Sequence, residues 1–69
     1  MTKVICKGDS IQPVTGRKLR DARAESHPFM GYFAGDSEPR LLIHWSYQAS
    51  DNDRHRCIGV ADCFERIGA

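Results

Sequence analysis

A strict alternation of apolar and polar residues in the middle of the chain constrains the fold more than any other feature. Between Arg40 and Gln48 the apolar positions are Leu41, Ile43, Trp45 and Tyr47. Because successive side chains of a strand point to opposite faces, this period of two predicts a half-buried β-strand. A polar turn at residues 49–53 and a β-rich segment from His55 to Val60 come next, so we expect an antiparallel hairpin.

The segments before this hairpin predict further short strands. Phe29 to Ala34 is rich in aromatic residues, and the turn sequence Gly-Asp-Ser-Glu-Pro separates it from the alternating strand. It is therefore the expected first strand of a three-stranded antiparallel meander over Phe29 to Val60. Near the N-terminus, Lys3 to Cys6 is brief and β-branched. Pro13 has no N–H to donate to a ladder, so this short N-terminal strand region is expected at a sheet edge.

Two segments carry helical spacing. Thr15 is a candidate N-cap for a basic helix over Arg17 to Glu25, which His27-Pro28 would end. Near the C-terminus, apolar residues recur with helical period up to Ile67, and Gly68 would close a short amphipathic helix. The predicted fold class is therefore α+β: a three-stranded antiparallel meander with a short N-terminal strand and one or two short helices, forming a single domain over residues 1–69.

The length of the chain limits how stable such a domain is on its own. A domain of 69 residues buries only about 60% of the surface that its unfolded chain exposes. A single core of this size contributes roughly 3 to 5 kcal/mol of stability. We therefore expect help from a partner or from self-association, with a homodimer as one form of it.

Charge and cysteine content limit the class of protein. The net charge is +1 and the pI about 7.8, so any electrostatic partner must be recognised by a local patch. The cysteines are odd in number, at Cys6, Cys57 and Cys63, and no leader-like apolar segment follows Met1. The longest apolar run, Leu41 to Ile43, is far too short to span a membrane. These features predict a cytoplasmic protein without a membrane segment.

No motif in the sequence predicts catalysis. The tripeptide Gly-Asp-Ser occurs at residues 8–10 and 35–37, and turn chemistry explains a repeated tripeptide of this composition. A nucleophilic serine would need an oriented base and an oxyanion hole, and no triad-like spacing follows either serine. We therefore expect a protein that is not an enzyme and that carries no cofactor.

Several zinc-type ligands occur in the sequence without the spacing of a zinc site. The residues are Cys6, His44, His55, Cys57 and Cys63. Structural zinc sites usually show two closely spaced ligand pairs, and this chain offers one loose pair without a partner pair. A metal-stabilised module is kept as an alternative, and no metal ligand is assigned.

Basic and aromatic residues are the strongest candidates for a binding surface. Four basic residues crowd the segment 17–23, two arginines flank His55, and two tyrosines are expected to stay partly exposed. The candidate partner-binding residues are Arg17, Lys18, Arg20, Arg23, Tyr32, Tyr47, Arg54 and Arg56. Arginine and tyrosine are enriched where proteins bind one another.

These residues lead to one functional hypothesis and two alternatives. The sequence favours a small regulatory or inhibitory protein that binds a larger protein partner, of the size common among accessory proteins of phages and mobile elements. The first alternative is a small nucleic-acid-binding protein that uses the Arg17 to Arg23 cluster on phosphates. The second is the metal-stabilised module.

Overall fold

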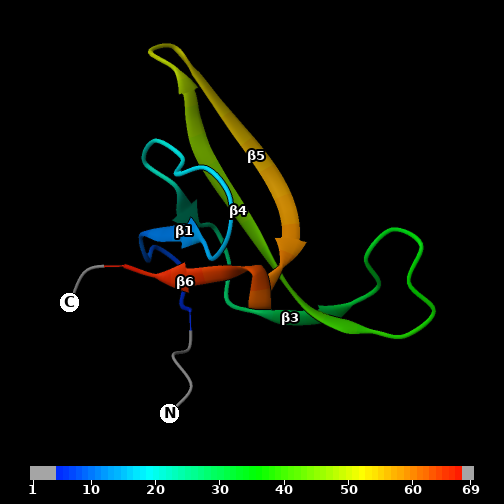
Figure 1. The fold of residues 1–69 in the computed structure, drawn as a ribbon. Coiled ribbons are helices and arrows are strands. Elements are labelled where there is room, and N and C mark those ends of the chain that lie inside the picture. Colours follow the sequence, from blue (N-terminus) through cyan, green and yellow to red (C-terminus); the bar gives the residue numbers. More distant parts are fainter. Residues whose placement is uncertain (1–4, 68–69) are drawn as a thin grey trace.

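The computed structural model describes residues 5–67, and its regular secondary structure is almost entirely strand, with short strands around one long hairpin (Figure 1). The strands are β1 (Ile11–Pro13), β2 (Arg23–Ala24), β3 (Phe29–Gly31), β4 (Arg40–Ser50), β5 (Asp53–Val60) and β6 (Phe64–Arg66). A single 3₁₀ turn, η1 (Ala61–Cys63), joins β5 to β6. In this part of the chain there is no α-helix, so the fold is all-β and the expected α+β class is wrong.

Strand β4 organises the larger sheet. Along one edge it pairs antiparallel with β5, from Leu42 opposite Val60 to Ser50 opposite Asp53, with a bulge between Gln48 and Ser50. Along its other edge it pairs with β2 and with β3, one after the other. The predicted meander of β3, β4 and β5 is therefore present in the sheet.

A second, two-stranded sheet of β1 and β6 lies beside the larger one (Figure 1). Pro13 pairs with Phe64 at the end of this ladder. Both strands of such a sheet are edges, which is where a proline is tolerated. The expectation that Pro13 belongs to an edge strand is confirmed.

The core lies between the two sheets and is small. Within residues 5–67 the buried apolar side chains are Ile5, Ile11, Ala22, Ala24, Leu42, Ile43 and Ala61. All of these except Leu42 form one cluster, against which Trp45, Tyr47 and Phe64 pack, with the rings of Trp45 and Phe64 4.7 Å apart. Three of the seven buried residues are alanines, so the core contains few large side chains.

The predicted alternation in β4 holds where β4 lies over the core. Ile43 is fully buried there, with Trp45 and Tyr47 on the same face. The pattern fails at the start of the strand, where Leu41 is exposed and Leu42 is buried. Phe29 lies opposite Leu42, and a Cβ on Gly31 would come within 3.0 Å of the Leu42 side chain, so β3 covers Leu42 on the face away from the core.

The expected basic helix at 17–25 is wrong. The side-chain amide of Gln12 binds Leu19 twice, donating to its carbonyl and accepting from its N–H, each at 2.8 Å. Asp21 takes a left-handed backbone with φ of 50°, which a helix does not allow. Ala22 and Ala24 are then buried on the core side as alternate residues of an extended segment.

The expected C-terminal helix is also wrong. Only η1 has helical geometry, and the chain then extends as β6 to pair with β1, with Ile11 opposite Arg66. Phe64 packs on Trp45 from an extended backbone, so the apolar spacing serves a turn and a strand. Gly68, the expected end of the helix, lies outside the described residues, as do Lys3 and Val4 of the predicted first strand, whose remaining residues Ile5 and Cys6 are not in a strand.

The described part of the chain contains no helix with the length and apolar character needed to cross a membrane.

Candidate partner-binding face

Three of the predicted arginines come together on the face of the larger sheet that points away from the core. Ser46 of β4 lies opposite Arg23 of β2 on one side and opposite Arg56 of β5 on the other. Residues directly opposite in antiparallel strands share a face, so these three side chains form a row across the sheet. Arg54 lies opposite Gln48, one position further along the same face. We call the surface of Arg23, Ser46, Arg54 and Arg56 the arginine face.

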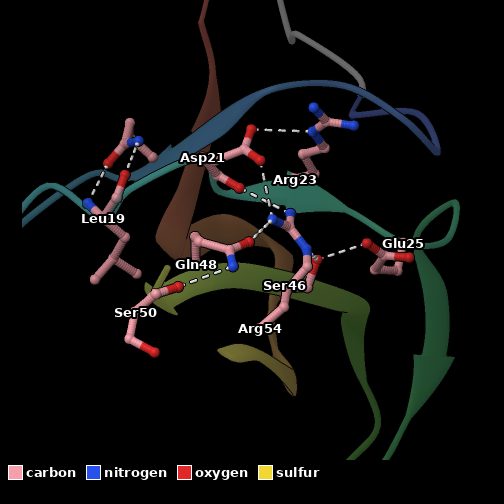
Figure 2. A network of polar contacts seen from close by, with 9 residues as sticks. Leu19, Asp21, Arg23, Glu25, Ser46, Gln48, Ser50 and Arg54 are labelled. Carbon is pink, nitrogen blue, oxygen red and sulfur yellow. Dashed lines mark hydrogen bonds and ion pairs between the residues drawn. The ribbon is translucent and has the colours of Figure 1, made fainter. Parts of the chain in front are cut away.

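Arg54 forms hydrogen bonds with neighbours from two segments, β4 and the loop before β2 (Figure 2). Its guanidinium donates to the Ser46 hydroxyl at 2.9 Å and to the Gln48 side-chain oxygen at 3.1 Å. It also donates to both the carboxylate and the backbone carbonyl of Asp21, at 3.0 and 2.8 Å. Arg54 therefore ties β5 to the loop before β2, and much of its hydrogen-bonding capacity is used inside the protein.

Ser46 lies between the arginines of the arginine face and is hydrogen bonded to Glu25 beside it. The Ser46 side chain is fully buried and donates its hydroxyl proton to Glu25 at 2.5 Å (Figure 2). This hydrogen bond lowers the pKa of Glu25, and the nearby charges of Arg56, Arg54 and Lys7 lower it further against the opposing effect of burial. Glu25 is therefore a carboxylate at neutral pH and offsets part of the positive charge around it.

A second carboxylate lies at the rim of the same face. Asp21 accepts from Arg23 at 3.1 Å as well as from Arg54. The hydrogen bond from Arg23 is the main cause of the lowered pKa of Asp21, with Arg54 contributing in the same direction. Because Asp21 and the Arg23 side chain are both about half exposed, this pair contributes little to stability.

Arg56 differs from its two neighbours. Within residues 5–67 it makes no hydrogen bond and no ion pair, and its side chain is exposed. It lines a hollow of about 380 Å³ together with Glu25, His44, Trp45, Cys57 and Ile58. Ile58 is 49% exposed at this hollow, so a charged group and an apolar side chain are offered to solvent side by side.

The other basic residues of the prediction do not join this face. Arg20 forms an exposed ion pair with Asp51 at the tip of the β4–β5 hairpin, 3.0 Å apart. Arg17 and Lys18 are exposed in the loop between β1 and β2. Among the described residues, neither shares a hydrogen-bond or ion-pair partner with Arg54 or Arg56. The predicted basic cluster at 17–23 is thus divided, and only Arg23 contributes to the arginine face.

The two predicted tyrosines lie elsewhere. Tyr47 is on the core side of the sheet, stacked on Trp45 and in contact with His55, to which its hydroxyl is hydrogen bonded at 3.2 Å. Tyr32 is 68% exposed in the loop after β3, which pairs with the start of β4. Arg40 and Ser46 are six strand residues apart, or about 20 Å, so Tyr32 is remote from the arginine face.

Several residues of this site were not predicted from the sequence. They are Asp21, Glu25, Ser46 and Ile58. A signal for the first two was present: the sequence Asp-Ala-Arg-Ala-Glu at 21–25 alternates strictly between charged and small apolar residues. A period of two is typical of a strand and places all three charges on one face.

The Gly-Asp-Ser repeats are turns, as predicted. Gly8 and Gly35 both have positive φ, and the Asp9 carboxylate accepts from the Cys6 N–H at 2.8 Å. Cys57 and Cys63 carry free thiols. Among the described residues there is no group of three or more metal-ligating side chains that could hold an ion, so the structure gives no support to the zinc alternative.

Comparison with known proteins identifies no relative: no family model, no curated protein and no solved structure matches the chain.

Proposed function

We propose that this chain is a small regulatory or inhibitory protein that binds a larger protein through its arginine face. The observation that carries the proposal is the state of Arg56. It is an exposed arginine without a hydrogen-bond or ion-pair partner in the described structure, and it lines the hollow together with the exposed Ile58. An arginine beside an apolar side chain and a pocket is the composition found at energetically important positions of protein interfaces.

The fixed geometry of the neighbouring groups supports the proposal. Arg54 and Ser46 are held by hydrogen bonds that already exist in the free chain. A partner therefore meets a surface that loses little side-chain freedom on binding. Only Arg56 and Ile58 remain to be ordered.

The two carboxylates favour a protein over a nucleic acid as the partner. Glu25 and Asp21 are ionised and lie among the arginines. A nucleic-acid backbone carries a negative phosphate at every nucleotide, so a strand lying over the arginines would be repelled by both of these carboxylates. A protein surface can place an acidic side chain at Arg56 and an apolar or neutral group at Glu25.

The small core also supports a binding role. The described residues expose seven large apolar side chains, among them Met30, Tyr32 and Ile58, whereas the larger buried aliphatic ones are Ile5, Ile11, Leu42 and Ile43. A partner that covers part of this surface stabilises the folded chain by mass action.

The experiment is a capture of proteins from a lysate on the immobilised chain, with charge-reversed variants compared in parallel. Arg56→Glu reverses the exposed arginine of the face. Arg17→Glu makes the same charge change in the β1–β2 loop and serves as the matched control. We expect a stoichiometric protein that the wild type and Arg17→Glu retain and that Arg56→Glu loses. Equal retention by all three chains would contradict the arginine face as the binding site.

Nuclease and salt distinguish the nucleic-acid alternative in the same experiment. Capture that survives nuclease treatment supports a direct protein contact. Capture that is lost with nuclease, together with an affinity for a labelled single strand that falls steeply with salt, would replace the protein-binding proposal by phosphate binding.

A further inference from the structure

The long outer edge of β5 has a free row of backbone hydrogen-bonding groups. The directions follow from β4: the His44 carbonyl accepts from Glu25, and the Gln48 N–H donates to Arg20, both on the β2 side. Backbone groups alternate in direction along a strand, so Ile43, Trp45 and Tyr47 of β4 face β5. Their partners on β5 are the odd-numbered residues from 55 to 59.

The even-numbered residues of β5 consequently direct their N–H and C=O groups away from β4. These residues are Arg54, Arg56, Ile58 and Val60. Among residues 5–67 there is no strand on this side of β5, and no backbone group of Arg54, Arg56 or Ile58 bonds to another segment. A strand of eight residues is therefore paired along one edge and open along the other.

We propose that this edge binds an extended acidic segment of the partner protein, which adds to the sheet as a further strand beside β5. The inference deepens the proposed function, since it rests on the same arginine face and specifies what that face recognises. Strand addition supplies main-chain hydrogen bonds for affinity, while alternate side chains of the added segment supply specificity.

The charges along β5 favour an acidic segment. The side chains of Arg54 and Arg56 point to one face from alternate positions of the strand. An added strand places every second side chain on that same face, directly beside Arg56. A carboxylate there would pair with the one arginine of the face that makes no internal ion pair in the described structure, and the neighbouring apolar side chain would reach Ile58 and the hollow.

The same charges disfavour a second copy of this chain at the edge. An antiparallel pairing centred on Arg56 sets the two Arg56 side chains opposite each other, and a shift of the register by two residues toward the β4–β5 turn sets Arg54 opposite Arg56. Like charges directly opposite are destabilising. Charged side chains are a common means by which open edges avoid self-association, and here they leave the edge accessible to a segment of opposite charge.

The probe is a blocked peptide of about ten residues that alternates glutamate with threonine, labelled for fluorescence anisotropy and titrated with the full chain. Two control peptides carry lysine in place of glutamate, or keep the sequence with N-methylated backbone nitrogens at the central glutamates and threonines. We expect the acidic peptide to bind at least about tenfold more tightly than either control, because the first lacks the charge and the second lacks the N–H groups of the ladder. Equal binding of the acidic and N-methylated peptides would overturn the strand-addition proposal.

A pair of variants separates the backbone from the side chain. Ile58→Ala removes the apolar group and keeps the outward N–H, whereas Ile58→Pro removes the N–H as well, at a position where β4 does not need it. We expect the proline variant to bind the acidic peptide at least about tenfold more weakly than the alanine variant. A chain made by chemical synthesis with an N-methylated Ile58 gives the same comparison if the proline variant does not fold.

The outcomes distinguish this inference from the proposed function. If Arg56→Glu abolishes binding of the acidic peptide but the alanine and proline variants bind alike, the arginine face stands and strand addition is wrong. If Arg56→Glu binds as the wild type does, both fail. A chain that sediments as a dimer in the absence of peptide, and whose Ile58→Pro variant sediments as a monomer, would show that a second copy occupies the edge and would overturn the acidic segment.

Discussion

The two outer edges of the larger sheet are treated in opposite ways by the rest of the chain. The outer edge of β2 is covered: Gly8 donates to the Ala24 carbonyl at 2.8 Å, Ala24 donates to Asp9 at 2.9 Å, and Ile11 donates to Ala22 at 3.0 Å. The outer edge of β5 has no such neighbour among the described residues.

The difference follows from what each edge carries. Strand β2 has two residues, and its Ala24 is buried at the core together with Ala22, which precedes the strand, so the backbone groups of both require partners. Strand β5 has eight residues, and its outer edge lies in water beside Arg54 and Arg56. The edge of β2 next to the core is covered, and the edge of β5 beside Arg54 and Arg56 is open. The two edges therefore separate the stabilising part of the sheet from the part available for binding.

The largest loss of stability is expected from a substitution in β4, the strand to which both edge strands pair. Ile43 is fully buried in β4, the strand that pairs with both β2 and β5. Ile43→Ala should lower the free energy of unfolding by about 3 kcal/mol, through lost burial and a cavity. Urea denaturation measures it. Ile58→Ala, an exposed aliphatic truncation on β5, is the control and should stay within about 0.5 kcal/mol of wild type.

A smaller loss of stability is expected from removing the hydrogen bonds that connect β5 to the segment before β2. Arg54 joins β5 to Asp21, just before β2, and also binds the buried Ser46. Arg54→Met keeps the aliphatic stem and removes these bonds, which should cost about 1.5 kcal/mol at the low end of the range for hydrogen bonds to charged groups, since Asp21 is half exposed. Arg56→Met, which removes no internal bond, should change thermal stability little. Equal losses of stability in both variants would mean that the hydrogen bonds of Arg54 to Asp21 and Ser46 contribute nothing to it.

The smallest effect on stability is expected from a change of pH. It acts through two carboxylates next to β2, at the covered edge of the sheet. The lowered pKa values of Glu25 and Asp21 mean that the unfolded chain binds protons more readily than the folded one in acid. Their contribution to stability is present above the usual carboxyl range of about pH 4 and is lost as the pH falls through their folded-state pKa values. We expect the melting temperature to fall between about pH 5 and 3, and less steeply in Glu25→Gln. A parallel decline in both proteins would assign the effect to other carboxyls.

The sequence predicts the hairpin well because its signal is local. From Ile43 to Gln48 the period of two is unbroken, and each side chain lies on the predicted face. The following strand was predicted from His55 to Val60, and β5 begins two residues earlier, at Asp53. Here the preference of the residues for their faces and the fold agree, except at the polar Ser46, which is fully buried on the outer face. Such agreement is the condition under which single-sequence reasoning succeeds.

The two helices were mispredicted because non-local contacts decide their segments. A thin stripe of Leu19 and Ala22 fits a helix, but the amide of Gln12, seven residues earlier, binds the Leu19 backbone and the loop turns at Asp21. Phe64 packs on Trp45 from a strand and not from a helix, because the backbone of β6 pairs with β1. The candidate site was divided for the same reason: Arg23 meets Arg54 and Arg56 only because β2 pairs with β4.

Amide hydrogen exchange, read residue by residue by NMR with and without the acidic peptide, tests the open edge most directly. In the free chain we expect slow exchange at Cys57, which is bonded to β4, and at Ala24, which is bonded to Asp9, and fast exchange at Arg56 and Ile58. With saturating peptide, Arg56 and Ile58 should become protected while Ala24 is unchanged. Protection of Arg56 and Ile58 in the free monomer, or no added protection with the peptide bound, would contradict the claim that β5 offers an open edge for an acidic strand.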